Sequence, residues 1–143
     1  MKTELIAEIG QNHNGDLDLA KELIRLAKES GADVAKFQVY DAKELFDSSK
    51  KNKWFEYNCQ TELTRDQICS LAEYSHKLNI EFMASVFDLE RIEWLEDVGV
   101  KRYKLASRSI YDDVLIKALI KTGKPLIVSL GMWKGNKIPS FNS

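Results

Sequence analysis

Cysteine and histidine are both scarce in this sequence, which contains two of each among its 143 residues. The spacing of Cys59 and Cys69 does not match a metal-binding pair. Two unpatterned cysteines are more typical of the reducing cytoplasm than of a disulfide-bonded scaffold. We therefore expect a cytoplasmic protein.

An excess of charge and a long hydrophobic run are absent as well. The formal net charge is −1, so the chain has no overall basic field that would attract nucleic acid or a membrane surface. The apolar run Leu5-Ile6-Ala7 is too short for a signal peptide, and no stretch approaches the ~18 apolar residues of a membrane helix. We expect partners that are neither nucleic acid nor membrane.

What the sequence does contain is five short apolar segments that alternate with segments of helical periodicity. Strands are predicted over residues 5–9, 34–38, 80–86, 103–106 and 126–130. Helices are predicted over 16–30, 64–78, 88–98 and 111–122, the first three opened by Asp16, by a capping box at Thr64 and by Asp88. In the last helix, the residues expected to face inward are Val114, Leu115, Ala118 and Leu119.

The connection over residues 39–62 is unusually long for a compact domain. It contains Trp54, Phe55 and Tyr57. Two interpretations stay open: a segment that packs over a site, or a surface helix with a few packed aromatic side chains.

Strands that alternate with helices predict a parallel sheet with the helices outside. An open doubly wound sheet and part of a (β/α)8 barrel both fit. Polar residues lie in or at the end of all five strands, and the carboxyl ends of strands converge on one mouth only in a barrel. No G-x-G-x-x-G or Walker sequence follows the first strand. We therefore predict an α/β fold, a partial TIM (β/α)8 barrel of about five βα units with parallel strands.

Two of these polar residues are lysines, Lys36 and Lys104, at matching places in their strands. Burying an unpaired ammonium costs several kcal/mol or forces the lysine neutral. The pair therefore predicts a shared anionic partner. The alternative is that both side chains extend to the rim of the sheet and pair with surface carboxylates.

Four motifs resemble, in order, those of the sialic acid synthase family, which includes the N-acetylneuraminate, legionaminate and pseudaminate synthases and their spore-coat relatives. The resemblance covers about residues 4 to 132. The motifs are Ile6-Ala7-Glu8-Ile9-Gly10-Gln11-Asn12-His13-Asn14-Gly15, Lys36-Phe37-Gln38, Tyr103-Lys104-Leu105-Ala106-Ser107 and Gly123-Lys124-Pro125-Leu126-Ile127-Val128-Ser129-Leu130-Gly131-Met132.

This resemblance implies a TIM-barrel synthase that condenses phosphoenolpyruvate with an N-acetylated amino sugar to a nonulosonic acid. Glu8, Lys36 and Lys104 are then candidate catalytic residues. Gln38 resembles a sugar contact, and the two lysines resemble phosphoenolpyruvate ligands together with three serines. The candidate substrate-binding residues are Gln38, Ser85, Ser107 and Ser129.

The resemblance also implies a divalent metal, manganese or magnesium, in the complete enzyme. The family's metal-binding histidines follow the fifth strand, so we expect no metal ligands in this chain. His13 is predicted to stabilise its loop, and His76 to be exposed on a helix. Ser109 stands where the neuraminate synthases have a carboxylate that contacts the sugar, which predicts a different sugar acceptor.

Residues 1–143 are expected to be the N-terminal portion of the barrel domain, without the rest of the barrel or the family's C-terminal antifreeze-like domain. We expect the isolated chain to be inactive, and to form a homodimer or associate through its open sheet edges. Two other interpretations stay open: a non-catalytic remnant that binds an anion or a partner chain, and an aldolase that uses Lys104 as a Schiff-base amine.

Overall fold

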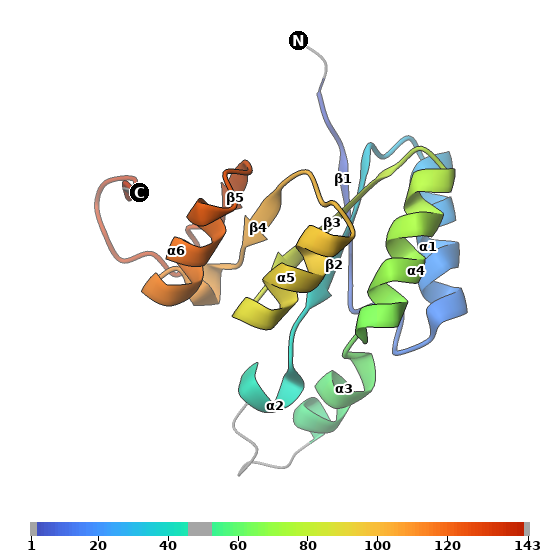
Figure 1. The fold of residues 1–143 in the computed structure, drawn as a ribbon, viewed down its shortest axis with the longest axis horizontal. Helices are drawn as coiled ribbons and strands as arrows, with labels where there is room; N and C mark the ends of the chain where they lie inside the picture. The colour runs from blue at the N-terminus through green and yellow to red at the C-terminus, as the bar shows by residue number, and fades with distance from the viewer. Residues whose placement is uncertain (1–2, 46–52, 142–143) are drawn as a thin grey trace.

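The computed structural model describes residues 3–45 and 53–141, which form one parallel sheet with helices between its strands (Figure 1). The strands lie in the order β1-β2-β3-β4-β5, and every neighbouring pair is parallel. Their bounds are β1 (Ile6–Gly10), β2 (Val34–Val39), β3 (Glu81–Val86), β4 (Tyr103–Leu105) and β5 (Leu126–Val128). This sequential order confirms the prediction of a partial (β/α)8 barrel, because a doubly wound sheet reverses its strand order at a switch point.

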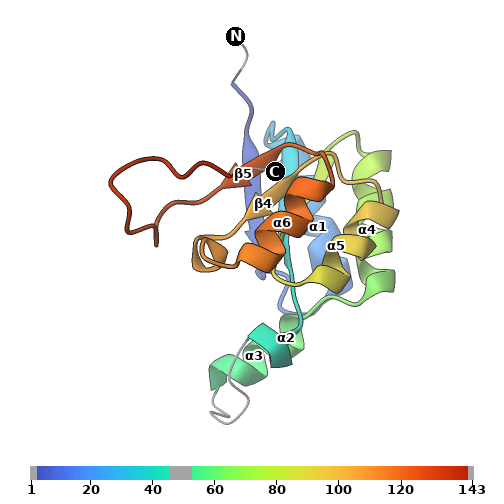
Figure 2. The ribbon, with the colours of Figure 1, turned by 60° about the vertical axis from the view of Figure 1, so that its left-hand side comes forward.

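The longer helices form a single layer along one side of the sheet (Figures 1 and 2). Neighbouring helices contact one another in the order α1, α4, α5, α6, and α1, α4 and α5 also pack on the strands. The outer helices of a barrel have this arrangement. The bounds are α1 (Leu17–Glu29), α4 (Arg65–Lys77), α5 (Leu89–Asp97) and α6 (Asp113–Lys121). None of the described helices is long and apolar enough to cross a membrane.

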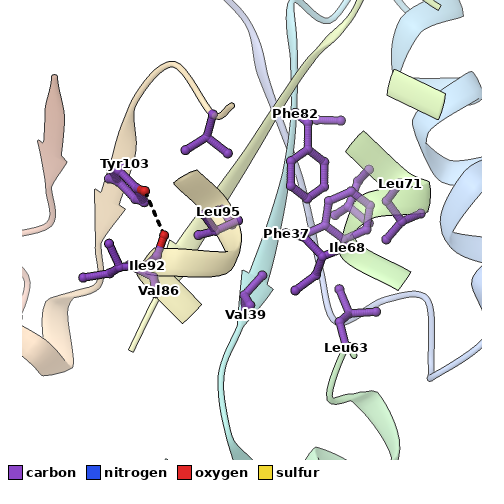
Figure 3. Packing of buried hydrophobic residues seen from close by; sticks show 14 of the residues in the cluster. Phe37, Val39, Leu63, Ile68, Leu71, Phe82, Val86, Ile92, Leu95 and Tyr103 are labelled. Atoms are coloured by element: carbon purple, nitrogen blue, oxygen red, sulfur yellow. Dashed lines mark hydrogen bonds between the residues drawn. The ribbon is translucent and has the colours of Figure 1, made fainter. Parts of the chain in front are cut away.

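The hydrophobic core lies between the sheet and these helices. Alternate residues of β2 and β3 point into it, and Phe37 stacks on Phe82 with ring centroids 5.5 Å apart. Ile68 and Leu71 of α4 close the core from the helix side (Figure 3). The other residues of the two strands therefore face the opposite, inner side of the sheet.

The ends of the helices agree with the predicted caps. The side chains of Asp16 and Asp88 accept hydrogen bonds from backbone N–H groups in the first turn of α1 and α5, and Asp112, which was not predicted as a cap, does the same for α6. Thr64 and Gln67 form the predicted capping box of α4. The predicted inward orientation of Val114 is wrong, because its side chain is 65% exposed while Leu115 and Leu119 are buried.

The long connection after β2 contains two further helices, α2 (Ala42–Leu45) and α3 (Lys53–Thr61), and residues 46–52 lie outside the described residues. Trp54 is 65% exposed. The Tyr57 hydroxyl donates to the carbonyl of Gln11 at 3.2 Å. Helix α3 is therefore the surface helix with packed aromatic contacts, the second of the two interpretations, and it packs on the loop after β1.

Candidate functional site

The inner face of the sheet carries most of the predicted site residues. Ala35, Phe37 and Val39 of β2 belong to the helix-side core, so Lys36 and Gln38 point to the inner face. The same alternation places Ser85 of β3 and Lys104 of β4 on that face. The strands thus gather the polar side chains on the side away from the helices, as the sequence predicts.

Lys36 is the most deeply buried charged residue of this group, with 6% of its surface exposed. Its ammonium forms a salt bridge with the Glu8 carboxylate from the neighbouring strand, and the two residues are partners in the β1–β2 register. Lys36 also donates a hydrogen bond of 3.4 Å to the Ser85 hydroxyl on β3. The lysine therefore bridges a carboxylate and a hydroxyl from the strands on either side.

A bulge at the end of β1 shapes the position of Glu8. The β1–β2 register shifts between Glu8 and Gly10, and Gly10 has a φ of +56° in the left-handed region that favours glycine. A Cβ at Gly10 would lie 3.5 Å from Glu8 Oε1 and 3.6 Å from Gln38 Nε2. The Glu8 carboxylate and the Gln38 amide thus lie close to the same point of the backbone.

Lys104 is half-buried, and its ammonium donates to the Ser129 hydroxyl just after β5. Burial lowers the pKa of Lys104, the positive charge of Lys36 lowers it further, and the negative charge of Glu8 opposes both effects. Glu8, Lys36 and Lys104 therefore form one electrostatically coupled group on the inner face.

Ser107 occupies a different position from the other predicted residues. It begins the short 3-10 helix η1 (Ser107–Ser109) after β4, and its hydroxyl accepts a hydrogen bond of 2.5 Å from the backbone N–H of Met132. A Cβ at Gly131 would lie only 3.2 Å from Ser107 Oγ. In this structure the Ser107 hydroxyl holds the loop after β5, and its predicted substrate contact stays a prediction, like the roles of the other six residues.

Sequence analysis missed a buried polar network that attaches the loop after β1 to α3. The Gln11 side-chain amide donates to Tyr40, to Asn58 Oδ1 at 2.7 Å and to Thr61 Oγ1 at 3.1 Å. Tyr40 and Thr61 are fully buried, and their hydroxyls hydrogen-bond each other at 2.8 Å. These residues are far apart in the sequence and show no periodicity. The one signal that could have indicated them is the presence of polar side chains in a segment that must pack.

A second missed feature is the buried guanidinium of Arg91, which is 5% exposed at the start of α5. It lies 3.6 Å from Asp41 and 3.5 Å from Glu62, which stand at the two ends of the α2–α3 segment. Glu62 also accepts from the backbone N–H of Ala42 at 2.9 Å. Arg91 therefore fixes the base of this segment to the barrel layer.

The described residues do not by themselves form a metal centre. No group of three or more His, Cys, Asp and Glu side chains that could hold a metal ion occurs among them. His13 is fully buried and its Nδ1 accepts from the backbone N–H of Gly15 at 3.1 Å, a contact within its own loop. His76 is exposed on α4. On the inner face the carboxylate is Glu8, which is engaged by Lys36.

The sequential parallel sheet, the single helix layer and the polar inner face define this chain as part of a (β/α)8-barrel protein. The comparison with protein families identifies the particular group. The model of the NeuB family matches residues 23–140, and the chain belongs to this family. Its relatives are sialic acid synthase-like proteins.

The N,N'-diacetyllegionaminic acid synthase of Campylobacter jejuni is 38% identical over 92% of this chain and 43% of its own length. The human N-acetylneuraminate-9-phosphate synthase is 37% identical over 90% of this chain and 39% of its own length. A solved structure of the N-acetylneuraminic acid synthetase of Leptospira borgpetersenii, in complex with citrate, superposes with a TM-score of 0.84 at 35% identity, over 92% of this chain and 45% of that chain. The chain thus spans less than half the length of these relatives.

Proposed function

We propose that this chain forms the phosphoenolpyruvate-binding part of a synthase that condenses phosphoenolpyruvate with an N-acetylated amino sugar to a nonulosonic acid. The observation that carries the proposal is the pair of lysines, Lys36 and Lys104, on the inner face with a serine hydroxyl bonded to each. Relatives named as legionaminic and neuraminic acid synthases support this choice of reaction class.

The chemistry of the inner face suits phosphoenolpyruvate, which carries a phosphate and a carboxylate. Two ammonium groups can each form a charge-assisted hydrogen bond with one of these anionic groups. The hydroxyls of Ser85 and Ser129 fix the directions of the two ammonium groups, since each accepts from one of them. In this proposal, Lys36 and Lys104 supply the attraction and the serines supply orientation.

The sugar acceptor would lie beside Glu8 and Gln38. The Gln38 amide can donate to and accept from sugar hydroxyls, and the Glu8 carboxylate can hold or move a proton at the reacting centre. A divalent manganese or magnesium ion in the complete enzyme would polarise the sugar aldehyde. The described residues do not fit such an ion alone, so we assign it no ligand and derive no step from it.

Calorimetric titration of phosphoenolpyruvate into the wild type, Lys36→Met and Lys104→Met tests the proposal. A charge-assisted hydrogen bond is worth ~1.5–3 kcal/mol, so each substitution should weaken binding about tenfold to a hundredfold. Lys124→Met is the matched control. Lys124 lies just before β5, at the amino ends of the strands, and its ammonium forms an ion pair with Glu96. Equal binding by all four proteins, or no binding by the folded wild type, would overturn the proposal.

Schiff-base chemistry at Lys104 is the second candidate function. Burial and the neighbouring positive charge of Lys36 lower the pKa of Lys104, and both effects favour the neutral, nucleophilic amine. Borohydride reduction in the presence of a keto acid would trap a covalent adduct on Lys104. A mass increase that Lys104→Met abolishes would favour this candidate, and an unmodified chain would exclude it.

A further inference from the structure

We propose that Glu8 competes with the anionic ligand for the ammonium of Lys36, so that ligand binding is linked to proton uptake by the Glu8 carboxylate. This inference rests on the proposed function, because it concerns the same anion-binding face. It adds a regulatory role for Glu8. In the free chain the Glu8 carboxylate pairs with the Lys36 ammonium, which is one of the two ammonium groups that the ligand needs.

The contacts of Lys36 are the first support. Its side chain is 7% exposed, and the polar groups that its ammonium contacts are the Glu8 carboxylate and the Ser85 hydroxyl. Glu8 has 57% of its side chain exposed. The carboxylate thus approaches a buried ammonium from the solvent side. An anion that binds Lys36 must displace this carboxylate or lie against it, and two negative charges within a few ångströms repel each other.

The contrast with Lys104 is the second support. Lys104 donates to the neutral hydroxyl of Ser129 and forms no salt bridge among the residues that the structure describes. The charged groups that face Glu8 are Lys36 from β2 and Lys104 from β4, and Gln38 beside it is neutral. An anion can therefore bind Lys104 without displacing a carboxylate, whereas access to Lys36 is controlled by Glu8.

Proton uptake follows from this competition. A Glu8 carboxylate that loses its ammonium partner and gains an anionic neighbour is destabilised relative to its protonated form. Its large exposure lets the proton come from solvent. Neutral Glu8 no longer competes, so the anion should bind more tightly as the pH falls toward the range in which carboxyl groups titrate. The bound anion would then have a carboxylic acid, a proton donor, beside it.

Inorganic sulfate is the best probe, because it keeps both negative charges between about pH 4 and 8, whereas the second proton of a phosphate titrates near pH 6. We expect the wild type to bind sulfate about twofold to fivefold more tightly near pH 4 than near pH 8, because a partly exposed ion pair is worth up to about 1 kcal/mol and glutamate carboxyl groups ordinarily take up a proton near pH 4. Glu8→Gln should bind near pH 8 at least as tightly as the wild type does near pH 4, with no pH dependence. Calorimetry in two buffers of different ionisation enthalpy should detect proton uptake in the wild type alone.

Glu4→Gln is the matched control, because Glu4 is a partly exposed carboxylate that pairs with Arg102 just before the same strand. It should follow the wild type at both pH values. Glu8→Gln retains Lys104 and both histidines, so a pH dependence that persists in this variant would assign the titration to one of these groups and overturn the inference. Should Glu8→Gln not fold, the proton uptake of the wild type still decides: its absence overturns the inference.

The outcomes also separate this inference from the proposed function. Binding of sulfate and phosphoenolpyruvate with equal affinity by the wild type and Glu8→Gln at both pH values would overturn the competition and leave the anion site standing. Absence of binding by every folded protein would overturn both. Binding by the wild type near pH 8 that becomes tighter in Glu8→Gln would support both.

Discussion

Ser85 of β3 lies opposite Lys104 of β4 in the sheet register, while its hydroxyl accepts a hydrogen bond from Lys36 on the other side. The strand between the two lysines therefore holds a hydroxyl on the inner face. The opposite face of β3 carries Phe82, Ala84 and Val86 into the helix-side core. The packing that stabilises the fold thus also fixes the separation of the two positive charges.

This arrangement predicts that Lys104→Met raises the thermal stability of the chain at neutral pH. Burial and the charge of Lys36 lower the pKa of Lys104, so the protonated ammonium reduces the free energy of unfolding. The unfolded chain keeps this proton up to about pH 10.4. Wild-type stability therefore rises with pH between the lowered pKa and about 10.4, and the gain from the substitution should shrink over that window. Melting curves of the wild type and Lys104→Met at neutral and alkaline pH measure this gain in stability.

Lys124→Met again provides the comparison. Lys124 forms an ion pair of 2.7 Å with Glu96, and the same change of side chain there should lower the melting temperature at neutral pH. A loss of stability by both variants would show that Lys104 is a structural lysine and contradict the prediction.

A second prediction concerns His13. Its Nδ1 accepts from Gly15, its Nε2 has no hydrogen-bond partner among the described residues, and burial lowers its pKa. The unfolded chain then takes up a proton on this imidazole at higher pH than the folded chain does. Stability should be full above about pH 6.5 and fall with acidification from there toward the lowered folded-state pKa. Urea denaturation across this range measures the decrease.

The chain offers its own control for this effect, because His76 is exposed on α4. His13→Asn keeps an acceptor for the Gly15 N–H group and should remove the acid-dependent part of the decrease, even where the smaller side chain lowers stability overall. His76→Asn makes the same substitution at this exposed position and serves as the comparison. If His13→Asn and His76→Asn reduce the pH dependence of the free energy of unfolding equally, the assignment to His13 is wrong.

A third prediction compares two glycines with similar backbone angles. Gly15 and Gly31 have φ values of +82° and +88°, so alanine at either position costs about 1–2 kcal/mol of backbone strain. A Cβ at Gly15 would also lie 2.3 Å from the backbone oxygen of Gln60 in α3, whereas one at Gly31 meets no described atom within 4 Å. Gly15→Ala should therefore lower the free energy of unfolding by about 1 kcal/mol or more beyond Gly31→Ala. Equal losses in urea denaturation would show that the β1 loop does not pack closely on α3.

The sequence predicts the sheet order and the residues on its inner face because both follow from short-range rules. Alternation along β2 and β3 fixes the side of Lys36, Gln38 and Ser85, and side-chain caps fix the starts of α1 and α5. The bond from Met132 to Ser107 was not predictable, because it depends on how a loop after β5 returns to η1. Val114 was mispredicted because helical spacing gives the apolar stripe of α6 but not which part of it contacts the sheet.

The last prediction tests the buried network around Gln11. Its amide nitrogen faces three oxygen atoms, those of Tyr40, Asn58 and Thr61. Gln11→Glu keeps the shape of the side chain and replaces this donor with an acceptor, so that the Asn58 oxygen loses its donor and faces another oxygen. An unsatisfied buried polar group costs about 1–3 kcal/mol, and urea denaturation should show a loss of this size.

Gln60→Glu gives the matched comparison for this network, because it makes the same change in the same helix interface. Gln60 is exposed and its amide donates to the Asn14 carbonyl at 3.3 Å. Water can replace that contact, so Gln60→Glu should lower the free energy of unfolding by no more than about 0.5 kcal/mol. The Gln11→Glu loss should also shrink at acidic pH, because the introduced carboxyl, once protonated, can again donate one hydrogen bond to Asn58 or Thr61. A loss for Gln11→Glu that is no larger than for Gln60→Glu would mean that the network does not hold the loop after β1 on α3.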